Sequence, residues 1–178
     1  MHEDIEEIIE VPENVDASLD GALSIKGPKG EVKREFQIPV ELNGKKIRLF
    51  AKRGTRNQKK LIMTTKAHIN NMIKGVLEGY NYVLQIVFVH FPMTLRVEKK
   101  TMFIKNFLGE SKERKANLYE NVEVKIEGDK IKIFSPDKEA AGQTAANIET
   151  ATRITNRDRR IFQDGIWIIE TPGKKYLE

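Results

Sequence analysis

The chain has 178 residues, 39% of them hydrophobic, with 31 Lys and Arg, 26 Asp and Glu and no cysteine. That length suffices for one or two domains of ordinary size, and the lack of cysteine excludes a disulfide framework, a thiol nucleophile and a cysteine-ligated zinc site. A chain without cysteine is typical of a reducing compartment, so we expect a cytoplasmic protein, and its longest apolar stretch, residues 83–91, is far short of the ~20 residues of a membrane helix.

The charge is distributed unevenly along the chain. Residues 1–20 hold eight acids and no Lys or Arg, so residues 21–178 hold all 31 cations against 18 acids, a net charge of +13. Such an excess is expected of a protein that binds a phosphate backbone. A run without any acid extends from Leu42 to Leu77, for which a solvated surface is an equally good interpretation. Its cations near the predicted hairpin and helix are Lys45, Lys46, Arg48, Lys52, Arg53, Arg56, Lys59 and Lys60.

The first eighty residues are expected to contain several strands followed by a helix. The strands are predicted over residues 5–11, 22–26, 32–36, 40–42 and 45–52. The first of these mixes apolar residues with acids, which favours an edge strand whose charges prevent nonspecific RNA contact. Asn43-Gly44 predicts a two-residue hairpin with a type I′ turn. An i, i+3, i+4 apolar stripe predicts a helix over 60–78, ended by Gly75 and Gly79, and a final strand is expected over 82–89.

The second half of the chain repeats this order of elements. Ile25-Lys26 and Gly30-Glu31 recur 79 residues later as Ile104-Lys105 and Gly109-Glu110, and the hairpin recurs after 84 residues around Gly128-Asp129. The predicted elements are a strand over 102–105, a hairpin over 123–134, an alanine-rich helix over 138–150 and a strand over 160–169. We therefore expect an α+β fold of two tandem duplicated modules, 1–82 and 83–178, each a mostly antiparallel β-sheet packed against one main helix.

Four segments carry recognisable motifs: 25–31 (IKGPKGE), 68–79 (HINNMIKGVLEG), 137–148 (DK followed by GQTAANI) and 157–169 (RDRRIFQDGIWII). In this order they resemble the family of ribosomal large-subunit protein six, in its archaeal and eukaryotic form, and the resemblance covers residues 5–171. It implies a structural protein of the large ribosomal subunit that binds rRNA near the sarcin-ricin loop and the stalk base, mainly through the C-terminal module. The implied partners are large-subunit rRNA, neighbouring ribosomal proteins including those of the stalk base, and translational GTPases that dock nearby.

The arginine-rich segment after the second helix is the strongest predicted RNA contact. Guanidinium groups bind phosphates bidentately and stack on splayed bases, and four arginines fall within eight residues, with Asp158 expected to hold one of them in place. The whole predicted rRNA-binding set is Lys138, Gln143, Asn147, Arg153, Arg157, Arg159, Arg160, Lys174 and Lys175. A secondary set in the first module is Lys29, Lys52, Arg53, Arg56, Lys59 and Lys60.

The second helix has two interpretations. Lys138 is placed either to hold a phosphate at the helix N-terminus or to be a solvated first-turn residue behind an Asp137 cap. Gln143 and Asn147, four residues apart, share a face that is either polar surface or RNA-facing. The family resemblance favours the RNA role for this helix.

Two further motifs favour structural roles. Residues 27–30 match the GxxG clamp of a KH domain, but that clamp joins two helices, whereas two predicted strands flank this one, so a β-turn is favoured, with Lys29 exposed at its tip. The alternation around Phe162 and Trp167 favours a half-buried strand with a bulge at Asp164-Gly165 over a stacking platform.

Catalytic motifs are missing from the sequence. It has no GxSxG elbow, HExxH helix or Walker loop, so we expect no enzyme, no cofactor and no metal site. The alternative function is a free KH-like module that binds single-stranded RNA. That alternative predicts affinity for short single strands regardless of RNA tertiary structure, whereas a ribosomal protein is expected to prefer a folded rRNA junction.

Overall fold

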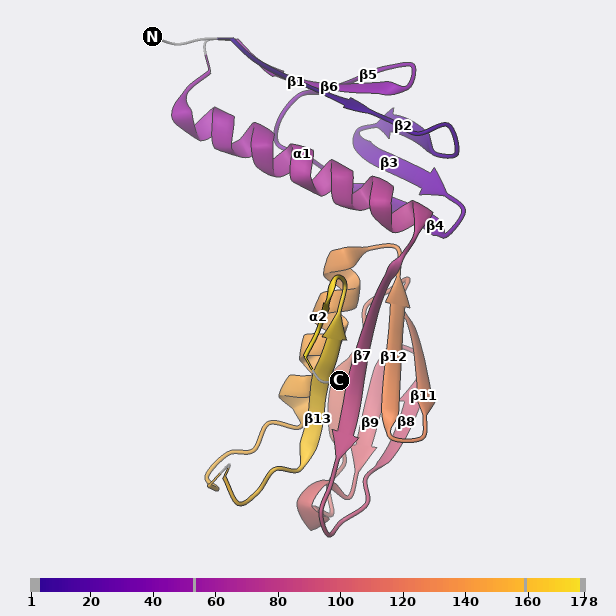
Figure 1. Cartoon of the computed structure of the whole chain (residues 1–178), viewed down its shortest axis with the longest axis vertical. Helices are drawn as coiled ribbons and strands as arrows, with labels where there is room; N and C mark the ends of the chain where they lie inside the picture. Colours follow the sequence, from indigo (N-terminus) through magenta and orange to yellow (C-terminus); the bar gives the residue numbers. More distant parts are fainter. Residues whose placement is uncertain (1–3, 53, 159, 177–178) are drawn as a thin grey trace. The chain divides into compact units, whose positions relative to one another are not determined.

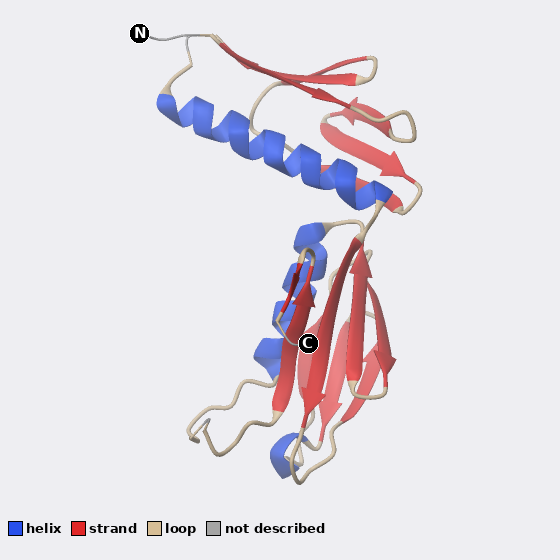
Figure 2. Cartoon of the chain, viewed as in Figure 1, coloured by secondary structure: helices blue, strands red, loops and turns tan. Residues whose placement is uncertain are grey.

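The computed structural model describes residues 4–52, 54–158 and 160–176. The chain divides into two compact units, Met1–Gly79 and Tyr80–Glu178, with the border three residues before the predicted one. Each unit combines antiparallel strands with one long helix (Figures 1 and 2). The predicted α+β class is therefore confirmed.

The described residues of the first unit form two three-stranded antiparallel sheets and a helix. The sheets have the strand orders β1-β6-β5 and β2-β3-β4. The elements are β1 (Ile5–Glu10), β2 (Asp16–Asp20), β3 (Ala22–Gly27), β4 (Gly30–Arg34), β5 (Val40–Asn43), β6 (Lys46–Ala51) and α1 (Arg56–Leu77). Helix α1 contacts β1, β3, β4 and β6. The core between them contains the fully buried side chains Leu23, Ile25, Ile47, Leu49, Ile62 and Ile69.

Strand β1 is the predicted acidic edge strand. It pairs only with β6 in its sheet, and Ile9 is buried in the core with 5% exposure. Glu6 accepts a hydrogen bond from Arg48 at 2.7 Å, and Glu7 accepts one from Lys66 on α1 at 2.7 Å. The acids of this strand are therefore compensated by cations of the same unit.

Helix α1 begins one turn before the predicted start. Thr55 is the N-cap: its side chain accepts a hydrogen bond from the Gln58 amide, and the Gln58 side chain accepts one from the Thr55 amide. This capping box satisfies two amides that the helix leaves without partners. The apolar stripe could not reveal this turn because residues 56–60 are all polar or charged.

The second unit contains a three-stranded and a five-stranded antiparallel sheet among the described residues. Their orders are β10-β9-β8 and β11-β12-β7-β13-β14. The elements are β7 (Tyr80–Val87), β8 (Thr94–Glu98), β9 (Thr101–Lys105), the 3-10 turn η1 (Phe107–Gly109), β10 (Arg114–Asn117), β11 (Glu123–Glu127), β12 (Lys130–Ser135), α2 (Lys138–Ala151), β13 (Gly165–Thr171) and β14 (Lys174–Lys175). Helix α2 contacts β7, β10, β12 and β13. Its alanines Ala140, Ala141 and Ala145 are buried, which allows the close approach that the sequence suggested.

The strand predicted over residues 82–89 belongs to the second unit. As β7 it pairs with β12 and β13, so the second unit takes in all of the strand, three residues more than the predicted module from residue 83. It corresponds to β1, because Leu84 lies opposite Ile131 as Ile9 lies opposite Ile47. The order of elements alone does not identify the sheet of β7, since its partners β12 and β13 come more than forty residues later.

Both predicted hairpins form, but the first is displaced by one residue. Asn43 pairs with Lys46 inside the ladder, so the loop is Gly44-Lys45, and Gly44 has a φ of 63°. The second loop is Gly128-Asp129, with a φ of 60° at Gly128. The two loops are thus equivalent, and the positive φ falls on glycine, where it causes no Cβ clash.

Candidate nucleic-acid interface

Residues 152–164, here called the arginine loop, connect α2 to β13. At its start Thr152 is buried, and its hydroxyl donates to the Glu149 carbonyl at 3.2 Å and accepts from the Ile166 amide at 2.9 Å. At its end the Asp164 side chain, 4% exposed, accepts a hydrogen bond from the Val89 amide at 3.4 Å. Both ends of the loop are therefore fixed by buried polar groups.

Arg114 on β10 fixes the C-terminal end of α2. Its Nη1 donates to the carbonyls of Ala151 and Arg153 at 3.0 and 3.1 Å, and its guanidinium lies 4.2 Å from the Phe107 ring centroid. The same group binds both carboxylate oxygens of Glu110, at 2.7 and 2.8 Å. This hydrogen bonding, more than any other cause, holds the pKa of Glu110 below its ordinary value. Since α2 has no basic residue in its last turn, Arg114 supplies the cation that favours a helix C-terminus.

The arginine loop exposes its cations. Arg153, Arg157 and Arg160 are all exposed, whereas Arg159 lies outside the described residues. The Asp158 carboxylate accepts hydrogen bonds from the guanidinium of Arg160 at 2.8 Å and from the backbone amide of Arg160 at 2.9 Å. These hydrogen bonds lower the pKa of Asp158. The prediction that Asp158 holds one arginine in place is confirmed. Arg153 and Arg157 form no ion pair with the described residues, although the charge of Arg157 helps to lower the pKa of Glu110.

Two aromatic residues, one in the loop and one in the strand that follows it, have structural roles. Phe162 packs against the core and carries Arg157 at 4.9 Å over its ring, and Trp167 lies half-buried in β13 with its Nε1 donating to the Gln163 carbonyl at 3.3 Å. Both also line a shallow hollow of about 510 Å³ whose rim includes Arg160. The predicted bulge at Asp164-Gly165 was wrong. The ladder is irregular further along, between Ile168 and Glu170.

The predicted residues of α2 divide between two faces of the helix, because Gln143 and Asn147 are four residues apart, whereas Lys138 lies on the side opposite to Asn147. Asp137 caps the helix by accepting from the Glu139 amide, as one interpretation expected, and Lys138 is exposed with its Nζ 5.9 Å from the Tyr80 ring centroid. Gln143 donates to Asn147 at 3.0 Å, and Asn147 in turn donates to the Asn117 carbonyl at 3.0 Å. Asn147 is therefore used at least partly to join α2 to β10.

The predicted set divides between two ends of the second unit. Lys138 is the first residue of α2 and the arginine loop follows the helix, so about 20 Å of helix separates them. Lys174 and Lys175 on β14 are exposed and follow β13 at the end away from the loop (Figure 1). Lys175 lies 4.0 Å from Glu170. A single short RNA segment would not contact all of these residues at once.

The secondary set lies in the first unit. Gly27 pairs with Gly30 across the loop of the β3–β4 hairpin, so the expected β-turn is confirmed and the arrangement is not a KH clamp between helices. The Lys29 amide donates to the Val76 carbonyl at 2.9 Å, and its side chain is exposed. The exposed members near α1 are Lys52, Arg56, Lys59 and Lys60. Arg53 lies outside the described residues.

Sequence reasoning missed Arg114, whose role depends on carbonyls 37 and 39 residues away. Its only sequence signal is a Glu four residues earlier, which is common on protein surfaces.

Among the residues that the structure describes, no group of three or more His, Asp or Glu is placed to hold a metal ion. None of the described helices is long and apolar enough to cross a membrane.

A duplicated antiparallel α+β fold with an exposed arginine loop defines a basic protein suited to binding RNA through its surface. The family model of ribosomal protein L6 matches residues 11–79 and 91–165. Proteins named large ribosomal subunit protein uL6 are 45% identical over 173 residues in Desulfurococcus amylolyticus (93% of this chain, 94% of the relative) and 43% identical over 169 residues in Saccharolobus solfataricus (92% and 93%). The relative from Methanocella arvoryzae is 46% identical over 165 residues (90% and 93%).

The chain therefore belongs to the ribosomal protein L6 family, and these relatives are archaeal. As a member it is a structural component of the large subunit of the cytoplasmic ribosome and binds rRNA.

Proposed function

We propose that the second unit is the main rRNA-binding module and that it attaches the protein to large-subunit rRNA near the sarcin-ricin loop and the stalk base. The supporting observation is the arginine loop. Its ends are fixed by Thr152, Asp164 and Arg114, and it presents Arg153 and Arg157 to solvent without ion pairs among the described residues. Fixing both ends of a loop in advance reduces the conformational entropy that it loses when it binds phosphates.

A second contact area lies at the other end of the unit. Three lysines are exposed there, Lys138, Lys174 and Lys175. Gln143 is also exposed, on α2 between Lys138 and the arginine loop. In this proposal the loop and the lysines bind separate backbone segments of one folded rRNA region. The protein then lies beside stalk-base proteins and close to where translational GTPases dock, and it has no catalytic activity of its own.

A competition experiment tests the proposal. The purified protein is bound to a labelled rRNA fragment that contains the sarcin-ricin and stalk-base helices, and unlabelled competitors are added at constant salt, because RNA affinity depends strongly on salt. We expect the same unlabelled fragment to compete at least tenfold better than a single-stranded RNA of equal length or a folded fragment from elsewhere in the rRNA. Equal competition by the single strand would support the KH-like alternative. Equal competition by the other folded fragment would contradict the proposed location.

A further inference from the structure

The connection between β7 and β8, residues 88–93, exposes two phenylalanine rings. Phe88 and Phe91 are 45% and 46% exposed, and Val89 between them is exposed as well. None of the described cations lies over either ring. Other phenylalanines of the chain do carry a Lys or Arg over the ring, namely Phe36, Phe50, Phe103, Phe107 and Phe162. The two rings of this connection therefore remain open to a ligand.

The connection is held in place at two points. The Val89 amide donates to the buried carboxylate of Asp164 at 3.4 Å. The Asn106 side chain donates to the Pro92 carbonyl at 3.1 Å. Because the chain on either side of the rings is fixed before a ligand arrives, less conformational entropy is lost when one binds.

The arginine loop lies beside Phe88. Gly165 pairs with Val87, so the residues that end the arginine loop lie next to the start of the connection. Arg160 and Val87 line the same hollow. The loop and the connection are found at the same end of the second unit (Figure 1). An exposed guanidinium group therefore lies near the first of the two rings.

A second guanidinium group lies near Phe91. The Phe91 ring packs on Gly109, because a Cβ at that glycine would lie 3.4 Å from the ring Cε1. Glu110 follows in the sequence, and the hydrogen bonds from Arg114 are the largest cause of its lowered pKa, to which the charge of Arg157 adds. Since Arg114 already binds this carboxylate, Arg157 is left to bind a phosphate.

The first unit has no such surface at the equivalent position. Strand β1 corresponds to β7, and residues 11–15 follow β1 as residues 88–93 follow β7. Val11 and Val15 are buried, and the residues between them are exposed but not aromatic. Helix α1 is followed by β7 after only two residues, so the arginine loop has no counterpart either. The duplicated fold therefore requires neither feature, and both occur together in the second unit.

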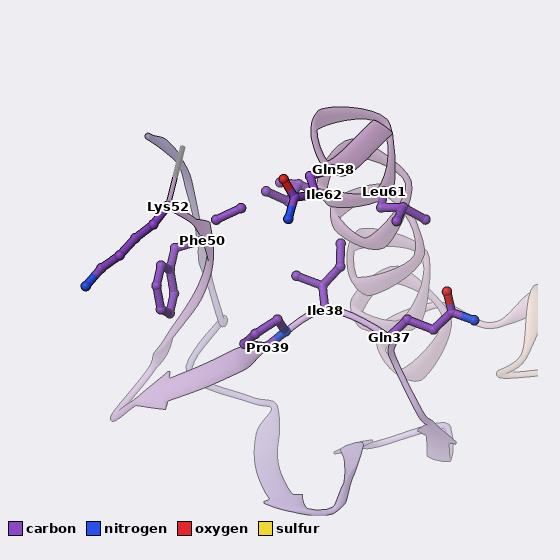
Figure 3. A pocket seen from close by; sticks show the side chains of 9 residues that line it. Gln37, Ile38, Pro39, Phe50, Lys52, Gln58, Leu61 and Ile62 are labelled. Atoms are coloured by element: carbon purple, nitrogen blue, oxygen red, sulfur yellow. The ribbon is translucent and has the colours of Figure 1, made fainter. Parts of the chain in front are cut away.

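A cavity of the first unit provides a contrast (Figure 3). It has a volume of about 470 Å³ and lies between residues 37–39, the end of β6 and the start of α1. Its lining is mainly aliphatic, and Lys52 points away from it. The ring of Phe50 in the lining lies 5.3 Å from the Arg48 guanidinium, which is paired with two glutamates. This cavity lacks the combination of open rings and available arginines found at residues 88–93.

We propose that residues 88–93 bind unpaired bases of the rRNA by stacking on Phe88 and Phe91, while the arginine loop binds phosphates of the same strand. Proteins bind single-stranded nucleic acid in this way, with bases on aromatic faces and cations along the backbone. The inference rests on the proposed function of the arginine loop. It adds that the loop meets a bulge, terminal loop or junction with splayed bases, because the bases of an uninterrupted duplex are not free to stack on protein rings. An apolar protein segment would also cover the rings, but the neighbouring arginines favour phosphates, which they bind bidentately.

The test uses the full-length protein and the labelled rRNA fragment with the sarcin-ricin and stalk-base helices. The double variant Phe88→Leu, Phe91→Leu keeps apolar side chains and removes both rings. It is expected to bind at least fivefold more weakly with an unchanged slope of log K against log salt, because stacking is lost and phosphate contacts are kept. Phe88→Tyr, Phe91→Tyr keeps the rings and should bind within twofold of wild type. Tyr119→Leu is the matched control, since it removes an exposed ring from another connection of the second unit, and it should also change the affinity less than twofold.

A ten-nucleotide chain of adenosines and the same chain with abasic sugars test stacking apart from the location in the rRNA. Wild type and the Tyr variant should bind the adenosine chain at least fivefold better than the abasic chain, and the Leu variant should lose this preference. The inference is overturned if wild type binds the two chains equally, if the Leu variant keeps the preference, or if the Leu variant loses no more affinity for the rRNA fragment than the Tyr variant or Tyr119→Leu. If the adenosine preference depends on the rings but the rRNA fragment binds no better than another folded RNA, stacking stands and the proposed location fails. Circular dichroism of each variant checks the fold.

Discussion

Replacing Arg114 by Met should destabilise the second unit more than the replacement of a residue near the surface usually does. The guanidinium makes two hydrogen bonds to main-chain carbonyls and two to Glu110, and its side chain is only 25% exposed. Hydrogen bonds to charged groups contribute about 1.5–3 kcal/mol each when they are well buried. Since solvent screens part of this arrangement, we expect a loss of about 2–4 kcal/mol in the free energy of unfolding.

Urea unfolding followed by tryptophan fluorescence measures this loss, because the only tryptophan, Trp167, lies in β13 of the second unit. With an m-value of about 2 kcal/mol/M, the midpoint should fall by about 1–2 M. Arg96→Met is the matched control. Arg96 pairs with Glu98 and Glu113 and lies over Phe103, but its side chain is 56% exposed, so its loss should cost less than about 1 kcal/mol.

The effect of Arg114→Met should also depend on pH. The folded-state pKa of Glu110 lies below its ordinary value of about 4.5, so its pairing stabilises the fold above that pH and is lost as the pH falls through the lowered pKa. The difference between wild type and Arg114→Met should therefore be largest near neutrality and decrease below about pH 4.5. Equal midpoints at pH 7, or equal losses in Arg114→Met and Arg96→Met, would refute the role assigned to this guanidinium.

Three other changes test the packing. Gly27→Ala should cost about 1–3 kcal/mol, because a Cβ there would lie 2.9 Å from both the Cγ2 and the carbonyl oxygen of Val76; thermal unfolding at unchanged Tm would contradict the close approach. Thr152→Val should lower the free energy of unfolding by about 1–3 kcal/mol and speed hydrogen exchange of the Ile166 amide, whereas Thr152→Ser should keep that amide protected. Equal exchange rates in the two variants would argue against the hydrogen bond. Burial raises the pKa of Tyr82, so its neutral form stabilises the fold below pH 10, and this contribution to stability is lost at higher pH. Tyr82→Phe should therefore lose less stability at alkaline pH than the wild type. Identical alkaline denaturation curves for the two proteins would count against this role of Tyr82.

Much of the fold could be predicted from local patterns. The hairpins, both helices and the edge strand β1 depend on turn chemistry and apolar periodicity within a few residues. The sheet membership of β7 could not be predicted in this way, because its sequence is apolar enough to pair in either unit and only the fold decides the partner. The start of α1 was also missed, since its capping box lies outside the apolar stripe.

The candidate site was predictable in composition but not in arrangement. Arginine content indicated the loop, and Asp158 was correctly expected to hold one arginine. Spacing alone could not show that Lys138 and Lys174 lie at the other end of the unit, or that Arg114 fixes the loop from a distant strand. The exposed rings of Phe88 and Phe91 were likewise hidden, because the end of an apolar run looks the same in the sequence whether it is exposed or buried.

The most direct test of rRNA binding through the arginine loop is a salt series with the sarcin-ricin fragment and the triple variant Arg153→Ala, Arg157→Ala, Arg160→Ala. The control removes the same charge from exposed, ion-paired lysines of the first unit, by Lys33→Ala, Lys46→Ala and Lys74→Ala. Each lost phosphate contact lowers the slope of log K against log salt by about 0.7–0.9, so we expect the arginine variant to bind more weakly with a slope reduced by about 2–3. The control should keep the wild-type slope to within about one contact. Equal slopes for wild type and the arginine variant, or equal reductions in both variants, would contradict the account.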